Sequence, residues 1–155
     1  HEVNPMVVGL HHITWRATAS GVADETVVAD AIAWLVGDPE LVEIEPTTSY
    51  HGSRLHMVTG VCKKKAHSLK SLSRMGTECL QTLLEEIEVR FDENHTLYFR
   101  IDFDAFIDGE VVLATSGQMA TIKCHTKIEV YPGQVAIEEC KNILKLAIEK
   151  VVTEG

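Results

Sequence analysis

Apolar and polar residues alternate along several short stretches of the chain, and this period of two predicts β-strands that each have one buried face. The plainest case is residues 97–103, where Leu97, Phe99 and Ile101 alternate with polar or charged residues. Further strands are predicted over residues 10–18, 41–46, 54–63, 110–115 and 121–131. Asp108-Gly109 is typical of a hairpin turn, so the strands on its two sides are expected to pair.

Other stretches repeat their apolar residues every three or four positions, which is the spacing of an amphipathic helix. Helices are predicted over residues 23–36, 66–74, 77–91 and 134–152, with a break or bend near Gly76. Each strand then has one apolar face and each helix one apolar stripe. We therefore predict an α+β fold of two layers, in which amphipathic helices pack on one face of a mostly antiparallel sheet.

The length and composition favour one domain over residues 1–155, with residues 1–5, which precede Met6, set aside as a tag remnant. No stretch approaches the roughly 18 consecutive apolar residues of a membrane-spanning helix, and no signal peptide is recognisable, so we expect a cytoplasmic protein with no membrane contact. The cysteines are widely spaced, which favours core residues in a reducing compartment over a zinc site or disulfides. They are Cys62, Cys79, Cys124 and Cys140.

The formal net charge of -9 argues against a nucleic-acid-binding protein, which usually carries a basic surplus. The charge is uneven, however, because no acidic residue lies between Glu45 and Glu78. The Lys and Arg residues within that interval are Arg54, Lys63, Lys64, Lys65, Lys70 and Arg74. A local basic patch can still attract phosphate, since salt limits the reach of each charge to about 10 Å.

The polar sides of the predicted strands collect basic and aromatic residues. They are His12, Thr14 and Arg16, then Arg54 and His56, then Tyr98, Arg100 and Asp102, and last Lys123, His125 and Lys127. If the strands are neighbours, these arginines and lysines can bind an RNA backbone while Tyr98 stacks on a base or sugar. The alternative is a solvated face with cross-strand ion pairs such as Arg100 with Asp102 or Lys127 with Glu129.

Three consecutive lysines, Lys63, Lys64 and Lys65, form a second basic feature. A loop or helix start of this kind suits contact with nucleic-acid phosphates without reading the base sequence. A solubilising surface loop is the alternative that the sequence leaves open.

The acidic residues at 92–108 offer weak signs of catalysis. Asp102 and Asp104 would lie on one face of a strand, where two carboxylates can hold Mg²⁺ for phosphodiester cleavage. Turn positions favour acidic residues for backbone reasons, which is the simpler explanation of Asp92 and Asp108. No phosphate-binding loop and no nucleophile with its base is recognisable. We therefore expect a protein without catalytic activity, cofactor or metal.

The segment Phe91 to Asp102, FDENHTLYFRID, resembles a characteristic stretch of an archaeal family whose members are described as predicted exosome subunits or RNA-binding proteins. The resemblance continues at Gly109-Glu110, at residues 130–133 before the last helix, and near the N-terminus at residues 16–18. It spans about residues 10–150.

This resemblance implies a fold similar to that of the large-subunit ribosomal protein that binds the small ribosomal RNA, and a role in RNA processing. The leading hypothesis is a non-catalytic accessory protein that binds RNA, with the subunits of an RNA-degrading complex as further partners. The alternative is a protein–protein interaction module without direct RNA contact, which includes a homodimer formed through the sheet edges.

Overall fold

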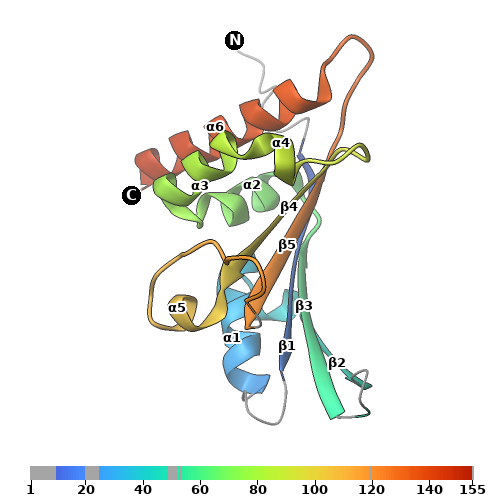
Figure 1. Cartoon of the computed structure of the whole chain (residues 1–155), viewed down its shortest axis with the longest axis vertical. Helices are drawn as coiled ribbons and strands as arrows, with labels where there is room; N and C mark the ends of the chain where they lie inside the picture. The colour runs from blue at the N-terminus through green and yellow to red at the C-terminus, as the bar shows by residue number, and fades with distance from the viewer. Residues whose placement is uncertain (1–9, 20–24, 49–51, 53, 119, 155) are drawn as a thin grey trace. The chain divides into compact units, whose positions relative to one another are not determined.

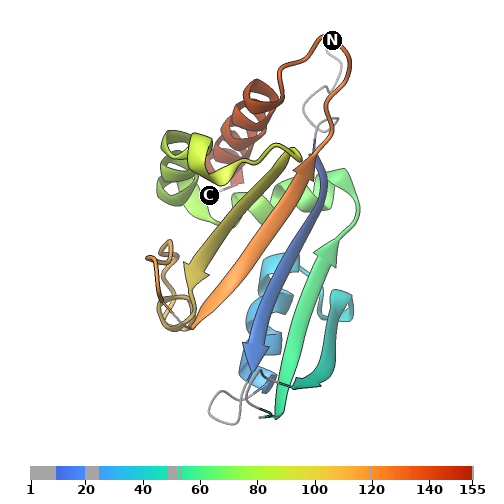
Figure 2. The ribbon, with the colours of Figure 1, turned by 45° about the vertical axis from the view of Figure 1, so that its right-hand side comes forward.

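A five-stranded antiparallel sheet runs through the computed structural model, which describes residues 10–19, 25–48, 52, 54–118 and 120–154. Its strands are β1 (Leu10–Ala19), β2 (Val42–Thr48), β3 (Arg54–Cys62), β4 (Thr96–Asp102) and β5 (Thr121–Ile128). They lie in the order β2-β3-β1-β5-β4, and adjacent strands run in opposite directions (Figure 2). The predicted α+β fold with an antiparallel sheet is confirmed.

The four stretches predicted as helices are helical, whereas the turn η2 and the helix α5 were not predicted (Figure 1). They are α1 (Glu25–Val36), the 3₁₀ turn η2 (Pro39–Leu41), α2 (Lys65–Ser73), α3 (Gly76–Glu85), α4 (Ile87–Arg90), α5 (Phe103–Ile107) and α6 (Ala136–Glu154). The single helix predicted over residues 77–91 is two helices, because Glu86 leaves the helical conformation with φ -104 and ψ 18. The predicted first residues of α1, 23 and 24, lie outside the described residues.

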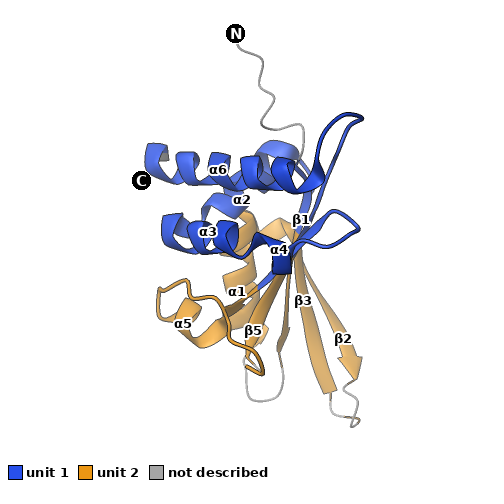
Figure 3. Ribbon diagram, turned by 45° about the horizontal axis from the view of Figure 1, so that its top comes forward, with its two compact units in different colours: residues 1–13, 62–99, 125–155 blue, residues 14–61, 100–124 orange. Residues whose placement is uncertain are grey.

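The chain forms two compact units (Figure 3). Unit 1 comprises residues 1–13, 62–99 and 125–155, and unit 2 comprises residues 14–61 and 100–124. Strands β1, β3, β4 and β5 pass from one unit into the other, so each unit contains its own segments of the sheet. Unit 1 also holds α2, α3, α4 and α6, whereas unit 2 holds α1, η2, α5 and all of β2.

The core of unit 1 is made by helix packing against the inner side of its strands. Helix α6 packs on α2 and α3, and Leu80, Leu83 and Leu144 on these helices are completely buried. Leu97 and Phe99 of β4 are buried as well, while Tyr98 between them is exposed. Burial of each such side chain stabilises the fold by roughly 1.5–3 kcal/mol. This gain explains why the apolar stripes predicted which sides of these helices and of β4 are buried.

The core of unit 2 depends on a close approach of α1 to β3. A Cβ atom added to Gly60 would lie 2.6 Å from Ile32 Cγ2 and 2.9 Å from Val36 Cγ1, so only glycine permits this spacing. Strand β2 pairs with β3, with Val42 opposite Gly60 and Pro46 opposite His56. Gly60 therefore marks the side of β3 that the helix covers.

This placement corrects the predicted faces of β3. Val58, Gly60 and Cys62 are the buried residues of the strand, and alternation puts Arg54 and His56 on the same side as them. The imidazole Nδ1 of His56 lies 3.0 Å from Glu25 Oε2, at the start of α1. The prediction that Arg54 and His56 belong to the polar face was wrong, because apolar residues occur on both sides of β3 and Gly60 has no hydrophobic side chain to reveal its burial.

The predicted hairpin at Asp108-Gly109 was right about the turn and the antiparallel return, and wrong about the strands on its two sides. Residues 103–107 form the short helix α5, whose first turn is capped by the Asp102 carboxylate accepting from the Ala105 amide at 3.0 Å. The chain then returns antiparallel to β4, with a bridge between Ile101 and Leu113 and a hydrogen bond from the Ala114 amide to the Arg100 carbonyl, but residues 110–115 do not form the predicted strand. Asp104 consequently lies in the first turn of a helix and does not share a strand face with Asp102. The predicted strand over 121–131 ends at Ile128.

The four cysteines are buried thiols, as the sequence predicted. Burial raises the pKa of Cys79 to about 11 and that of Cys140 to about 12, so both remain protonated and inert at neutral pH.

Across the described residues, no helix combines the length and apolar character that crossing a membrane requires.

Candidate nucleic-acid interface

The predicted polar face is confirmed on β1, β4 and β5. Buried residues on these strands alternate with exposed or half-exposed ones. The residues on the outer side are His12, Thr14 and Arg16 on β1, Tyr98, Arg100 and Asp102 on β4, and Lys123, His125 and Lys127 on β5. Their division between the two units gives two separate groups of cationic side chains.

The first group, which we call the unit 1 cluster, consists of His12, Lys63, Tyr98, His125 and Lys127. The rings of Tyr98 and His125 lie on adjacent strands with their centroids 6.1 Å apart. Tyr98 is 49% exposed, so its ring is accessible from solvent. Lys63 and Lys127 are exposed and form no ion pair with any residue that the structure describes.

His12 lies close to other basic groups of the unit 1 cluster. The hydroxyl of Thr126 donates to the His12 carbonyl, which ties β5 to β1 at this point. The pKa of His12 is lowered by partial burial and then by the positive charges of His11 and Lys63, with only Glu129 opposing them. A bound phosphate would favour the imidazolium form and reverse this effect.

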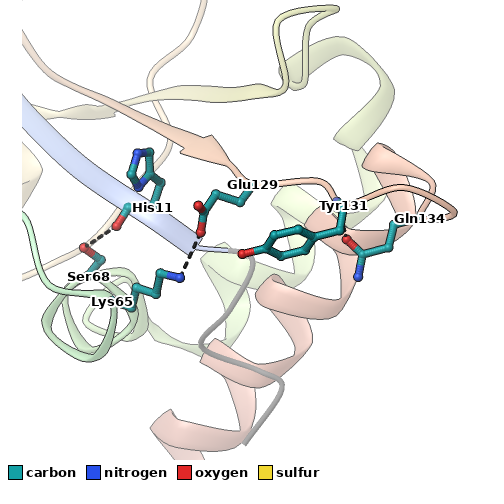
Figure 4. A network of polar contacts seen from close by, with 6 residues as sticks. All are labelled: His11, Lys65, Ser68, Glu129, Tyr131 and Gln134. Carbon is teal, nitrogen blue, oxygen red and sulfur yellow. Dashed lines mark hydrogen bonds and ion pairs between the residues drawn. The ribbon is translucent and has the colours of Figure 1, made fainter.

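The three consecutive lysines are not equivalent. Lys65 Nζ lies 2.9 Å from Glu129 Oε1, and this contact raises the pKa of Lys65 and lowers that of Glu129 (Figure 4). Lys63 and Lys64 are exposed. The expected pair of Lys127 with Glu129 is replaced by this contact with Lys65, so Lys63 and Lys64 are the members of the run that face solvent as unneutralised charges within the described part of the chain.

Helix α2 is held firmly where the lysine run ends. The Ser68 hydroxyl lies 3.0 Å from the Cys62 carbonyl, and Figure 4 shows its contact with the His11 carbonyl at 3.4 Å. These contacts fix the helix to β3 and β1. Lys64 provides no side-chain cap, and the first amides of α2 therefore add a partial positive charge beside the lysines.

The second group, which we call the arginine row, lies in unit 2 and consists of Arg16, Arg100 and Lys123. The Phe103 amide donates to the Ala120 carbonyl at 3.0 Å, and counting back along the antiparallel strands places Arg100 opposite Lys123. Arg16 projects from the other neighbour of β5 and is exposed, as is Lys123.

A loop residue that the sequence pattern did not indicate organises the end of the arginine row. Gln118 accepts from Arg100 Nη1 through its carbonyl at 3.4 Å, and its side-chain amide donates to Asp102. The amide of Ala105 and then Gln118 lower the pKa of Asp102. Asp102 therefore acts as a cap and acceptor within its own loop, in place of the expected ion pair with Arg100. A single glutamine in a loop has no periodicity that could have revealed this.

The predicted RNA-binding residues thus separate into four sets. Lys63, Tyr98 and Lys127 gather in unit 1 with Lys64 nearby, and Arg16, Arg100 and Lys123 gather in unit 2. Lys65 is paired with Glu129. Arg54 lies on the side of β3 that also carries the buried Val58 and Gly60. His12 and His125, which the sequence placed on this face without assigning them to RNA, join the unit 1 cluster.

The strand face expected to bring Asp102 and Asp104 together is not formed, since Asp104 is on α5. Among the residues that the structure describes, no group of three or more His, Cys, Asp or Glu side chains is placed to hold a metal ion.

Comparison with known proteins gives a family match and several related folds. Residues 12–128 match the model of the RNA_binding family, described as RNA binding. Mth689, a DUF54 protein from Methanothermobacter thermautotrophicus, is 27% identical over 88% of this chain and 98% of that chain, with a TM-score of 0.72. No curated protein matches the chain.

Two more distant structures share the fold. A DUF54 protein from Archaeoglobus fulgidus is 22% identical, covers 90% of this chain and 98% of its own, and superimposes with a TM-score of 0.65. A UPF0201 protein from Methanococcus jannaschii is 17% identical, with coverages of 86% and 98% and a TM-score of 0.57. The proteins from these three archaea agree with the archaeal family that residues 91–102 resemble.

Proposed function

Because this chain belongs to the RNA_binding family, we propose that it is a non-catalytic accessory protein that holds an RNA backbone on the outer side of its strands. The observation that carries the proposal is the family match itself, whose span of residues 12–128 includes the whole unit 1 cluster and the whole arginine row. Both groups are cationic surfaces of a chain whose net charge is -9.

The chemistry of the two groups favours backbone binding without base-sequence readout. Lysine ammonium groups act as point charges toward phosphate, while a guanidinium can bind a phosphate through two parallel hydrogen bonds. Tyr98 adds a ring on which an unpaired base can stack, a contact that tolerates any base. Because duplex bases are already stacked, single-stranded RNA is the preferred ligand.

A titration of the whole chain with fluorescently labelled RNA tests this proposal. Single-stranded and hairpin RNA are compared at about 50 and 200 mM salt, a range over which binding through several phosphates weakens by orders of magnitude. We expect tighter binding of the single strand and an affinity that falls steeply with salt. An absence of binding at the lower salt concentration, or an affinity independent of salt, would overturn the proposal.

The non-catalytic part is tested by incubating the same RNA with the protein and Mg²⁺ or Mn²⁺. We expect the RNA to remain intact. Cleavage that Asp102→Asn abolishes would contradict this part of the proposal.

We further propose that the protein acts in the cytoplasm with an RNA-degrading complex, a role supported by the resemblance of residues 91–102 to predicted exosome subunits. Affinity purification from the native organism checks it. Recovery of ribonuclease subunits that remain bound after the RNA has been digested supports the association, and their absence from the purified material contradicts it.

A further inference from the structure

Unit 2 exposes a group of apolar side chains that its own core does not need. Trp34 of α1 is 53% exposed, and its ring makes an edge contact with Phe106 of α5, with the centroids 5.5 Å apart. Ile107, beside Phe106, is 46% exposed. We call Trp34, Phe106 and Ile107 the aromatic patch.

Trp34 does not belong to the buried face of its helix. Helix α1 buries Val28, Ala31, Ile32, Leu35 and Val36. Trp34 lies on the other side of the same helix, whereas Trp15 of β1 is completely buried. Exposed tryptophan is uncommon on protein surfaces but enriched at the centres of protein interfaces, where it accounts for much of the binding free energy.

Acidic side chains surround the aromatic patch in the chain. Asp30 lies one helical turn before Trp34, Asp104 opens α5, and Asp108 and Glu110 follow Ile107. All four are exposed, and none forms an ion pair with another residue in the described part of the chain. The Lys and Arg residues of unit 2 lie on strands, so these carboxylates have no cation from α1 or α5 to neutralise them.

We propose that the aromatic patch is a docking surface for a basic, amphipathic segment of a protein partner. Apolar side chains of that segment cover Trp34 and Ile107, and its lysines or arginines pair with Asp30, Asp104 and Asp108. Charge complementarity selects this occupant, because a cation gains from these carboxylates whereas RNA or an anionic lipid surface is repelled by them. A second copy is disfavoured too, because a two-fold contact would bring the same acidic residues together.

The experiment uses three synthetic peptides of about 18 residues, or five helical turns. The first carries a leucine stripe and a lysine face. The second keeps the lysines but has serine in place of leucine, and the third keeps the leucines but has glutamate in place of lysine. Binding of each labelled peptide to the whole chain is measured by fluorescence anisotropy. We expect the first peptide to bind at least about tenfold more tightly than either of the others.

Variants locate the binding. Trp34→Ala is expected to lower the affinity for the first peptide about tenfold or more, as for a tryptophan at the centre of an interface. Trp34→Phe is expected to retain most of the affinity. Asp104→Asn with Asp108→Asn should lower the affinity and flatten its dependence on salt. Val89→Ala, at a site 86% exposed in unit 1, is the matched control and should change nothing. Thermal unfolding confirms that each variant is folded.

Several results would overturn the proposal. Equal affinity for the first two peptides would show that charge alone determines binding. Affinity for the first peptide that Trp34→Ala leaves unchanged would show that the aromatic patch is not the binding site. A dimer that dissociates in the Trp34→Ala variant would identify a second copy as the occupant, and weakened RNA binding in that variant would identify RNA. The proposal does not rest on the RNA-binding function. Unit 1 variants that lose RNA binding should bind the first peptide as tightly as the unchanged protein does.

Discussion

Unit 1 and unit 2 divide the charge of the chain unequally. By sequence, unit 1 contains ten Lys and Arg residues against twelve Asp and Glu, whereas unit 2 contains four against eleven. The helices of unit 1 pair their own charges, as Arg90 does with Glu86 and Lys141 with Glu138. In unit 2 the ion pair found among described residues joins His56 and Glu25, so most of its carboxylates lack a basic partner there.

The difference shows why net charge is a poor guide to the function of this chain. A total of -9 conceals outer strand sides that are cationic in both units and a helical region of unit 2 that is acidic. Since salt screens charges over about 10 Å, each surface interacts with a ligand largely through its own residues. The cationic strand sides suit phosphate, and the acidic region around Trp34 suits a basic protein segment.

The comparison is tested most strongly by reversing charge in unit 1. Lys63→Glu combined with Lys127→Glu should weaken RNA binding by about 30-fold or more, because attraction to two phosphates becomes repulsion. The slope of log affinity against log salt should fall by about 1 for each phosphate that the variant no longer neutralises. Anisotropy titration over a salt series measures both quantities. Lys145→Glu, on the exposed side of α6, is the matched control for each single reversal and should have little effect. Equal weakening by Lys63→Glu, Lys127→Glu and Lys145→Glu would show that only net charge matters.

Gly60→Ala tests which side of β3 faces α1. This assignment is the reason that Arg54 is not counted among the RNA-binding residues. The added methyl group would overlap Ile32 and Val36, and overpacking of this kind should lower the free energy of unfolding by about 1–3 kcal/mol. Denaturant titration measures the change, with Thr59→Ala as the neighbouring control. Unchanged stability in Gly60→Ala would mean that α1 does not pack on this side of β3.

Charge reversal in the arginine row should have a smaller effect than in unit 1. Arg16→Glu with Lys123→Glu is expected to weaken RNA binding about tenfold, since the acidic surroundings of unit 2 already offset part of the attraction to phosphate. The same titration series compares the two double variants directly. A larger effect than that of Lys63→Glu with Lys127→Glu would reverse the ranking of the two units.

The smallest expected effect is a dependence on pH through His12. In the free protein the pKa of His12 is lowered, so His12 holds its proton less readily than an ordinary histidine, whereas a bound phosphate favours its protonated form. RNA binding should therefore take up a proton and tighten by about threefold or less as the pH falls from 7 toward the lowered pKa. In the absence of RNA, the same shift means that stability is lost as the pH falls below 6.5, because the unfolded chain binds the proton more readily.

His12→Gln is the control for this effect and should flatten the pH dependence of RNA affinity measured between pH 5.5 and 7.5, a window of about one unit on each side of the ordinary histidine pKa. A pH dependence that persists unchanged in His12→Gln would assign it to another histidine.

The strands that the sequence predicted well are those with a strong contrast between their two sides. On β4, Leu97, Phe99 and Ile101 are buried and Tyr98 is exposed, so burial follows hydrophobicity. On β3 the contrast is weak, and the decisive residue is Gly60, whose importance comes from what surrounds it. At residues 103–107 the helix α5 was not predicted, although the Asp102 cap that begins it is encoded in the sequence.

For the candidate site, alternation alone located most of the outer residues of β1, β4 and β5. It could not show which charges are already neutralised. Lys65 and Glu129 are distant in sequence and meet through the fold, in which Ser68 links α2 to β1 and β3. The acidic surroundings of Trp34 also depend on the fold, since α1 and α5 come from the two separate chain segments that make up unit 2.

The central claim is that RNA contacts the unit 1 cluster and avoids the aromatic patch. Ultraviolet crosslinking of thiouridine-substituted single-stranded RNA to the whole chain, followed by mass spectrometry of the peptides, tests it most directly. We predict adducts on peptides that contain Tyr98, Lys63 or Lys127. Adducts concentrated on Trp34 and Phe106 would contradict the claim.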